Sequence, residues 1–590
     1  MTILTKTQKR FDLIFFALLF AASIFLSFDL MYKEGKPTTP GVFYSDKSHY
    51  YVYLPATFIY GWDAEKFPEK VDTVFRGFVL DKVSNKVIIK VTSGVAILCT
   101  PFFLVTQGIA LVLGIETTGF SDYYQKAGLI PPIFYFILGL WFLKRFLDHY
   151  FKRYISYLVV LIVAAGTNLY YYALVEGWMS HIFSFFLFSA LLYLLKWFID
   201  SGMGSFRRFI LIALVVSIAV LIRPTNILLL LWLALLDVST LKQIWQRILF
   251  FLRPKYSLTF LAIGVMVFIP QFLYWYYLSG SLVYYSYPGE GFIFWENPMI
   301  FEVWFAQLNG LFVYNPLVFF MVAGMIYMIV KKIPNGWFLF FFFLLNSYVI
   351  GSWHAWFFGG SYGSRPFAEF FALFAMAFAY LFSRLLEIRN LFLRFSMFFL
   401  IFLSVLFNQR MIYNPTWNIS STWAWDDFRN YLDLKNILHF EKNSYTYRED
   451  FENITFDITV NKTKVSYRSA TMSCMVYKAY PYACHFVRPL NQILDHDIRK
   501  INITYHINPF LRDTCGAVLV YMLMNEKGEP LLYKTTPVDK PGSKRGAWTA
   551  VTASIDVPFW FNDSGYSFAC YLWNLKQTTF LVDDIEIRFE

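Results

Sequence analysis

Hydrophobic and polar positions divide the chain into two parts. As far as residue 408, long apolar runs follow one another with short polar loops between them. An α-helix needs about 20 apolar residues to cross the hydrocarbon core of a bilayer. The pattern predicts eleven spans, near residues 11–28, 127–147, 154–173, 178–198, 206–222, 226–237, 257–277, 311–330, 336–351, 366–385 and 391–408.

Two apolar stretches depart from this pattern. Residues 226–237 are too short to cross alone, so we expect a half-helix or a broken pair with the preceding span, with its backbone covered by protein. Residues 91–113 are long enough, but Ser93, Pro101 and Gln107 interrupt the run. We expect a helix lying on the outer membrane surface, and a twelfth span is the alternative.

Basic residues predict the orientation of the spans. If the eleven spans alternate, six basic clusters fall on one side, which is then cytoplasmic because Lys and Arg are retained there. The clusters are residues 6–10, 144–153, 207–208, 242–255, 331–332 and 384–394. The N-terminus is therefore expected inside and the C-terminus outside. Residues 29–126 would form a long outer loop, and long loops in compact proteins tend to carry function.

After residue 408 the period changes from that of helices to that of strands. Apolar residues alternate with polar ones near residues 454–460 and 501–507, and the chain ends in the alternating run VDDIEIRFE. Residues 526–528 read as a hairpin turn. We predict an extracytoplasmic all-β sandwich of jelly-roll type at residues 441–590, joined by a connector at residues 409–440 to an all-α membrane domain at residues 1–408.

Four of the five cysteines lie in the predicted β domain. Three connectivities are possible, and spacing does not choose between them. Cys474 with Cys484 and Cys515 with Cys570 is the arrangement that we prefer, and neither spacing resembles a zinc site.

Composition supports the membrane assignment. Of 590 residues, 57% are hydrophobic and 22% aromatic, while 15% are charged, compared with about 25% charged in a typical soluble chain. The formal charge of +11 raises the question of nucleic acid binding. We exclude it, because the basic residues lie mainly between hydrophobic segments, where they determine topology.

The first candidate for chemistry lies near the start of the predicted outer loop, in the run SDKSHY at residues 45–50. The carboxylate of Asp46 could serve as a general base that takes a proton from a hydroxyl nucleophile. The alternative is that Asp46 caps the following helix. Lys47, His49 and Tyr50 in the same run are further candidates.

Two other clusters fall at predicted outer turns. Glu176 and His181 lie between the third and fourth spans, where ionisable groups near the membrane are expensive and usually mark a site. The alternative for Glu176 is a place in headgroup water. Arg223 and Asn226 lie between two apolar runs, and a basic residue on the outer side needs an anionic partner, either a bulk lipid phosphate or that of a bound donor.

The strongest local pattern is the glycine-rich run GSWHAWFFGGSYGSRP at residues 351–366. Glycines allow close backbone approach, and Arg365 opens the tenth span with a helix N-terminus beneath it, which suits a phosphate. His354, Ser361 and Tyr362 share this run, which could alternatively be a plain interface anchor. Glu290, in the loop after the seventh span, is a weaker candidate for the acceptor side, since its neighbours resemble a turn.

Several common motifs are absent or misplaced. Residues 495–497, Asp-His-Asp, match the D-x-D of metal-dependent nucleotide-sugar enzymes, but they lie in the predicted β domain and are interpreted as a loop. The sequence contains no P-loop, no G-x-G-x-x-G fingerprint and no H-E-x-x-H motif.

The N-terminal part resembles the glycosyltransferase C superfamily, which includes protein O-mannosyltransferases and the aminoarabinose transferases of lipid A. The strings SDKSHYYVYLPATF, EGWMSH, LIRPTN, NGLFVYNPL and WFFGGSYGSRPF are similar to those of membrane glycosyltransferase-like proteins of Bacteroidetes-type bacteria. The resemblance implies a multi-pass protein of the bacterial cytoplasmic membrane. It also implies Asp46 as the base and a polyprenyl-phosphate sugar whose phosphate is held by Arg365 and Arg223, with His354 beside them. Lys47 stands where relatives often have a second acidic residue, so we predict transfer without a metal.

The C-terminal part resembles carbohydrate-binding modules of the β-sandwich kind, whose chains often end in a D-D-I-x-I-like strand. Such modules stack sugars on exposed aromatic rings. The candidates here are Tyr480, Tyr482, Trp548, Trp560 and Trp573, although some of these will belong to the core.

These patterns together predict transfer of a sugar from a polyprenyl-phosphate donor to a hydroxyl of a glycan, lipid or protein at the outer face of the membrane, with inversion. No cofactor is predicted, because the lipid-linked sugar is a substrate. One alternative is a lipid or solute transporter, but only one broken pair and no repeat are evident. The other is a non-catalytic sugar-binding protein, which would not need Asp46.

Overall fold

A computed structural model describes most of the N-terminal part and the main strands of the C-terminal part. The described residues are 5–33, 36–37, 41–287, 289–359, 361–413, 445–449, 462–463, 468, 473–476, 482–490, 493, 498, 500–509, 514–525, 528–539, 544–557 and 566–590. The chain forms two compact units, Met1–Phe428 and Arg429–Glu590. Most of the predicted connector, residues 414–440, lies outside the described residues, as do Tyr480, Trp560, residues 454–460 and residues 495–497.

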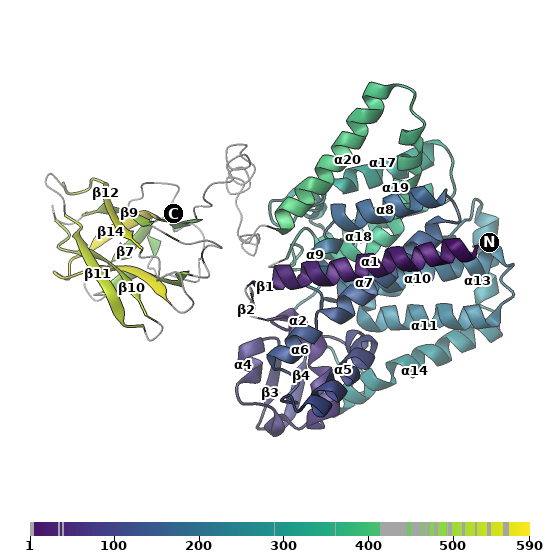
Figure 1. Ribbon diagram of the computed structural model, residues 1–590, viewed down its shortest axis with the longest axis horizontal. Helices are drawn as coiled ribbons and strands as arrows, with labels where there is room; N and C mark the ends of the chain where they lie inside the picture. Colours follow the sequence, from purple (N-terminus) through teal and green to yellow (C-terminus); the bar gives the residue numbers. More distant parts are fainter. Residues whose placement is uncertain are drawn as a thin grey trace. The chain divides into compact units, whose positions relative to one another are not determined.

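The first unit is helical (Figure 1). Its longer helices are α1 (Lys6–Met31), α5 (Gly94–Leu113), α7 (Ile130–Leu147), α8 (Arg153–Gly166), α10 (Ser180–Asp200), α11 (Phe206–Ile222), α13 (Leu241–Phe251), α14 (Pro254–Ser279), α17 (Leu317–Val330), α18 (Gly336–Gly351), α19 (Phe371–Leu386) and α20 (Leu391–Ile412). Shorter pieces include α2 (Asp46–Tyr51), η1 (Ala56–Tyr60), α4 (Val71–Phe75), α6 (Asp122–Ala127), α9 (Leu169–Leu174), η3 (Pro224–Leu229), α12 (Leu230–Leu235), α15 (Ile300–Phe305), α16 (Leu311–Tyr314) and η4 (Arg365–Phe370). Strands β3 (Phe78–Asp81) and β4 (Lys86–Ile89) form a hairpin.

Burial of the apolar helices separates a core from a periphery. The spans at Ser180–Asp200 and Arg365–Leu386 are 78% and 72% buried, whereas those of α1, α14 and α20 are 17%, 11% and 17% buried. Extended apolar surface of this kind is covered by lipid rather than water. Seven helices in the described residues are long and apolar enough to cross a bilayer, and four shorter ones accompany them. The chain is therefore a membrane protein, while the count of eleven spans stays a prediction.

Contacts between loops define two ends of the bundle. At one end the start of α1 contacts the α7–α8 turn, because Lys144 donates to Asp12 across 2.9 Å and Arg153 donates to the same carboxylate across 2.8 Å. Lys196 near the end of α10 pairs with Asp237 after α12 at 2.9 Å. The N-terminus and α13 lie at this end, and α2, α4 and the β3–β4 hairpin lie at the other (Figure 1). We call these the N-terminal end and the opposite end.

Helix α5 starts and finishes at the opposite end. Just before it, Thr92 donates its hydroxyl to the carbonyl of Ile222, where α11 ends. Just after it, the carbonyl of Thr118 accepts from Tyr60 at 2.7 Å. Helix α5 is long and apolar enough to cross a bilayer, so the expectation that residues 91–113 make no crossing stays a prediction.

The second unit contains two antiparallel sheets. One has the order β11-β10-β13-β8, and the other has the order β12-β9-β14-β7-β6, with β5 also paired to β14. The strands are β5 (Tyr445–Glu449), β6 (Lys462–Thr463), β7 (Ser473–Val476), β8 (Tyr482–Pro489), β9 (Lys500–Asn508), β10 (Val518–Met524), β11 (Pro530–Pro537), β12 (Thr549–Asp556), β13 (Ser567–Trp573) and β14 (Phe580–Phe589). Alternate residues of both sheets, such as Ile503, Leu519 and Ile587, form one core, so the all-β prediction is confirmed.

Two local predictions in this unit have different outcomes. Strands β10 and β11 pair as a hairpin, and Gly528 at its turn has φ +78°, where only glycine is unstrained. The preferred Cys515–Cys570 disulfide is wrong, because both thiols are free and buried. Sequence spacing carries no information about which cysteines face the core from different strands.

The close contact between α17 and α19 generates a stability prediction. A Cβ atom added at Gly324 would lie 2.2 Å from the carbonyl oxygen of Ala377, whereas at Gly264 its nearest neighbour would be 3.8 Å away. We expect Gly324→Ala to lower the free energy of unfolding by ~1–3 kcal/mol through overpacking. Gly264→Ala should leave the thermal midpoint in detergent unchanged or slightly raised, since alanine favours helix. Equal midpoints for the two variants would contradict this packing.

Candidate functional site

Asp46 is the first residue of α2 and belongs to an ion pair rather than to a helix cap. Residue Ser45 is the N-cap, with φ +59°, and no side-chain capping bond is made there. Oδ2 of Asp46 instead accepts a hydrogen bond from Nη1 of Arg365 at 3.1 Å. The Asp46 side chain is 52% exposed and that of Arg365 18%, so the carboxylate remains accessible to a ligand.

Buried amides hold the turn from which Arg365 projects. Gly363 has φ +56°, and a Cβ atom there would lie 2.6 Å from the amide nitrogen of Asn315. That amide donates to the Gly363 carbonyl at 3.2 Å, and Asn168 donates to the Tyr362 carbonyl at 3.0 Å. Gly363 therefore allows the backbone to approach Asn315 closely. The hydrogen bonds to this turn fix the position at which η4 begins and from which Arg365 projects.

A second group of ionisable side chains comes from the start of α10, from the residue before η3 and from the end of η4. His181 contacts Glu369 through Nδ1 and Oε2 at 2.8 Å, and both side chains are buried. Arg223 reaches the other oxygen of Glu369 at 3.3 Å and His181 at 3.0 Å. Arg223 is thus held by a buried carboxylate while 21% of its side chain stays exposed.

Two lysine side chains from the segment between α1 and α7, Lys47 and Lys90, complete the site. Lys47 donates to Glu176 at 3.0 Å and is 5% exposed. Lys90, which follows β4, pairs with Glu290, and its ammonium lies 4.7 Å from the centre of the Tyr287 ring.

The backbone of Lys90 also determines the tautomer of His49. Its N–H donates to Nδ1 of His49 at 3.4 Å. Nε2 is therefore left to carry the ring proton when His49 is neutral.

Electrostatics distinguish the ionisable groups of α2. Burial raises the pKa of Asp46, but the charges of Arg365 and His49 and the Arg365 hydrogen bond outweigh it and hold this pKa below its usual range. Burial lowers the pKa of His49 to about 4 against the opposing charge of Asp46. Burial also raises the pKa of Tyr50, whose charged neighbours include Arg223, Asp46 and Arg365. At neutral pH Asp46 is therefore ionised and His49 is neutral.

The structure brings most of the predicted site residues together and assigns others to packing. Tyr362 is fully buried, and its hydroxyl lies between the Tyr314 carbonyl and Asn408. Ser361 is buried and bonds to Tyr172. Tyr362 and Ser361 therefore shape the turn before Arg365.

The remaining two candidates also have structural contacts. Asn226 is buried and donates to the Ala219 carbonyl at 2.9 Å, which closes the break between α11 and η3. His354 packs on Trp353 and donates its backbone N–H to the carbonyl of Gly291. No contact among the described residues joins the His354 ring to Arg365, so its role in phosphate binding stays a prediction.

Two residues of the site were missed by sequence reasoning. Glu369 lies four residues after Arg365 inside an apolar run, and a carboxylate at such a position is itself a signal. Lys90 lies on the outer side of the predicted topology, against the positive-inside tendency, just as Arg223 does.

The cations and carboxylates of the site are matched in number. Lys47, Lys90, Arg223 and Arg365 each contact one carboxylate, respectively from Glu176, Glu290, Glu369 and Asp46. Among the described residues, no three His, Cys, Asp or Glu side chains converge as metal ligands. The exposed members, Asp46 and Lys90 above all, are those that a ligand reaches without breaking a buried pair.

Comparisons with known proteins give little further information. No protein-family model matches the chain, and no curated protein matches it. Among solved structures, the CBM22-1 xylan-binding domain of Xyn10C from Paenibacillus barcinonensis aligns with 14% identity over 25% of this chain and 92% of that domain. The TM-score is 0.18, which is too low for this likeness to bear on fold or function.

The depressed pKa of His49 makes stability depend on pH. Between the unfolded value of 6.5 and the folded value of about 4, the unfolded chain binds more protons, so stability falls as pH falls through this window. The loss is at most about 3 kcal/mol. His49→Gln should therefore lose less thermal stability than wild type between pH 7 and pH 4.5, measured by unfolding in detergent. Parallel losses in both proteins would contradict a neutral His49, since the contribution of Asp46 is present in each.

Proposed function

We propose that the protein is a membrane glycosyltransferase that transfers a sugar from a polyprenyl-phosphate donor to a hydroxyl of a glycan, lipid or protein acceptor. The observation that carries the proposal is the exposed Asp46–Arg365 pair at the opposite end of the bundle. It sets a candidate base beside a cation that suits a phosphate.

Asp46 has the properties that the base requires. Its carboxylate is ionised at neutral pH and half exposed. In the proposed step it takes the proton of the acceptor hydroxyl while that oxygen attacks the anomeric carbon. The bond from this carbon to the phosphate oxygen breaks, and its electron pair leaves with the polyprenyl phosphate. A single direct displacement inverts the anomeric centre.

Arg365 couples the two halves of this step. In the free protein it neutralises Asp46. When Asp46 becomes protonated, its negative charge is lost just as the leaving phosphate gains one. A guanidinium that contacts both groups therefore stays paired throughout, which stabilises the developing charge without new solvation. Arg223 and Lys90 supply further cations for the phosphate.

Replacement of the base tests the proposal. We expect Asp46→Asn to reduce transfer of radiolabelled sugar from polyprenyl-phosphate donors by ~10²–10⁴-fold in reconstituted membranes, the usual contribution of a general base. Glu65→Gln is the matched control, because Glu65 is an exposed carboxylate of the same segment, outside the site. Donor binding and thermal stability should change little in either variant.

Other outcomes separate the rival functions. Equal transfer by Asp46→Asn and wild type would remove Asp46 from the mechanism. Movement of labelled lipid or solute across the membrane without transfer, over a broad donor and acceptor panel, would favour transport. Sugar binding without either activity would favour a non-catalytic protein.

Substitution of Arg365 tests the proposed phosphate site separately. Arg365→Gln should weaken binding of the polyprenyl phosphate product at least tenfold, because a charge-assisted hydrogen bond to phosphate contributes ~1.5–3 kcal/mol. Lys126→Gln, at an exposed pair with Asp122, is the control. Binding can be measured by calorimetry in nanodiscs. Unchanged affinity in Arg365→Gln would exclude this residue from the phosphate site.

The second unit offers a surface for the acceptor. The outer face of the sheet formed by β11, β10, β13 and β8 carries Tyr482, Tyr571 and Trp573, with ring centres 5.5 Å and 6.0 Å from Tyr482. Tyr533 on the same face bonds to Tyr571 and is 49% exposed. Rings supported by a small apolar cluster that includes Met522 present flat faces and hydroxyls, which suit a sugar.

This face leads to a binding prediction for the full chain. Tyr482→Ala with Trp573→Ala should reduce binding of the acceptor oligosaccharide at least tenfold, measured on immobilised glycans with protein in nanodiscs. Trp548→Ala is the control, because Trp548 precedes β12 in the other sheet. Retained binding in the double variant would place the acceptor elsewhere.

A further inference from the structure

Helix α13 presents an apolar stripe that the described part of the protein leaves exposed. Leu241, Trp245, Leu249 and Leu252 follow one another at helical spacing, and their side chains are 84%, 61%, 48% and 62% exposed. Residues three, four and seven apart share one face of a helix, so these four lie together. None of the residues of α13 is fully buried.

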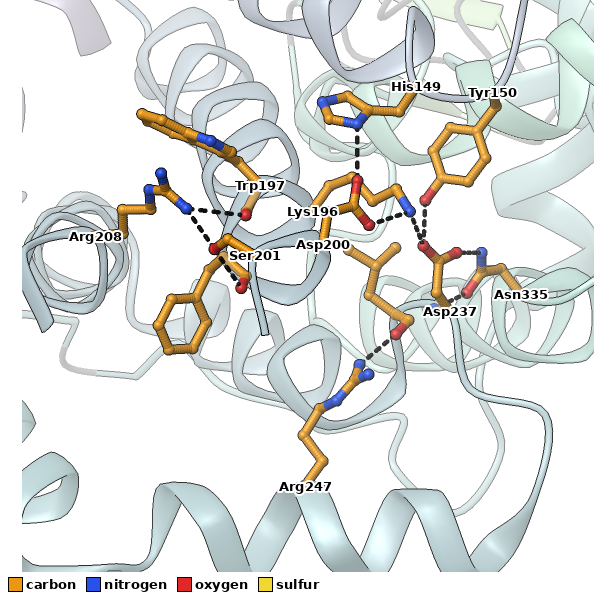
Figure 2. A network of polar contacts seen from close by, with 12 residues as sticks. His149, Tyr150, Lys196, Trp197, Asp200, Ser201, Arg208, Asp237, Arg247 and Asn335 are labelled. Atoms are coloured by element: carbon orange, nitrogen blue, oxygen red, sulfur yellow. Dashed lines mark hydrogen bonds and ion pairs between the residues drawn. The ribbon is translucent and has the colours of Figure 1, made fainter. Parts of the chain in front are cut away.

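The helix is nevertheless fixed on the bundle. Arg247, on another face of α13, donates to the carbonyl of Leu236 (Figure 2). The next residue, Asp237, accepts from Tyr150 at 2.6 Å and Asn335 at 2.8 Å and pairs with Lys196. These bonds tie the α12–α13 turn to three other segments at the N-terminal end.

Aromatic contacts are made by the face of α13 that carries Arg247. The ring of Phe251 lies 6.4 Å from that of Phe198 on α10 and 6.1 Å from that of Phe209 on α11. The packing of Phe251 and the hydrogen bond of Arg247 fix the rotation of α13 about its own axis. The exposure of the Leu241–Leu252 stripe is therefore a property of the fold and not of a loose segment.

The charges around α13 are almost all positive. Asp237 is the only acidic residue between Ser201 and Gly289, and it is already paired. The exposed cations near the helix are Arg207, Lys242, Arg253 and Lys255. Immediately after them, α14 begins with exposed apolar residues such as Leu258 and Leu261. The apolar stripe is thus continuous in sequence with a helix surface that faces lipid.

We propose that α13 lies in the bilayer interface at the N-terminal end, with its Leu241–Leu252 stripe in the acyl region and its flanking cations bound to anionic phospholipid headgroups. A helix with one cationic polar face and one apolar face that contains a Trp is the type that binds this interface. The cations give the surface a preference for anionic over zwitterionic lipid.

Depth measurement tests the position of the helix. The five native cysteines are buried, so Trp245→Cys and Gln246→Cys can be labelled with an environment-sensitive fluorophore in full-length protein. These neighbours point to different faces, about 100° apart on the helix. In nanodiscs the label at 245 should be quenched by shallow spin-labelled lipid and protected from iodide, and the label at 246 should show the reverse. Equal access of iodide to both would overturn the proposal, as would coverage of 245 by protein without lipid quenching.

The lipids that remain bound to the purified protein test the role of the cations that flank the stripe. Lys242→Gln with Arg253→Gln should lower the ratio of phosphatidylglycerol to phosphatidylcholine retained by the purified protein at least fivefold, measured by mass spectrometry from mixed membranes. Lys70→Gln with Lys82→Gln removes two exposed cations at the opposite end and serves as the control. An unchanged ratio in the α13 variant would overturn the headgroup assignment even if the label at 245 is inserted.

Discussion

Pairing of charges in the poorly solvated parts of the helix bundle is the constraint on which the rest of this structure depends. Ionised side chains in a poorly solvated region cost several kcal/mol each unless a partner compensates them. Asp46 pairs with Arg365, which lies 319 residues away in the sequence. Lys47 pairs with Glu176 and Lys144 with Asp12 in the same way. The long segment before α7 is thereby held against the helix bundle, and the site is a product of the same pairing that stabilises the fold.

Periodicity predicted the long apolar helices and several strands, but it missed α13 and the β3–β4 hairpin and gave no contacts. Apolar runs gave the helices, and alternation at residues 501–507 gave strand β9, because burial on one face leaves a repeat in the sequence. The break near residue 223 was also predicted from the sequence, because a short apolar run after Pro224 cannot continue a span. The orientation drawn from the basic clusters stays a prediction.

Contacts between distant segments left weaker traces. Asp46 and Arg365 were each singled out by composition, but nothing in the sequence states that they meet. Glu369 was overlooked because a single carboxylate barely alters the hydropathy of its run, although its cost in a membrane is large. Tyr362 was selected with its glycine-rich neighbours, yet a buried hydroxyl bonded to a backbone carbonyl serves packing. Residue type alone does not distinguish these roles.

Both ends of α5 contact the opposite end of the bundle, where α2, α4 and the β3–β4 hairpin also lie (Figure 1). Asp46 and Lys90 belong to this stretch between α1 and α7, whereas Arg223, Glu369 and Arg365 belong to the helix bundle. The site is thus shared between two parts of the chain that are far apart in sequence. The pairs Asp46–Arg365, Lys47–Glu176 and Lys90–Glu290 join these parts, so a change of charge on one side requires a compensating change on the other.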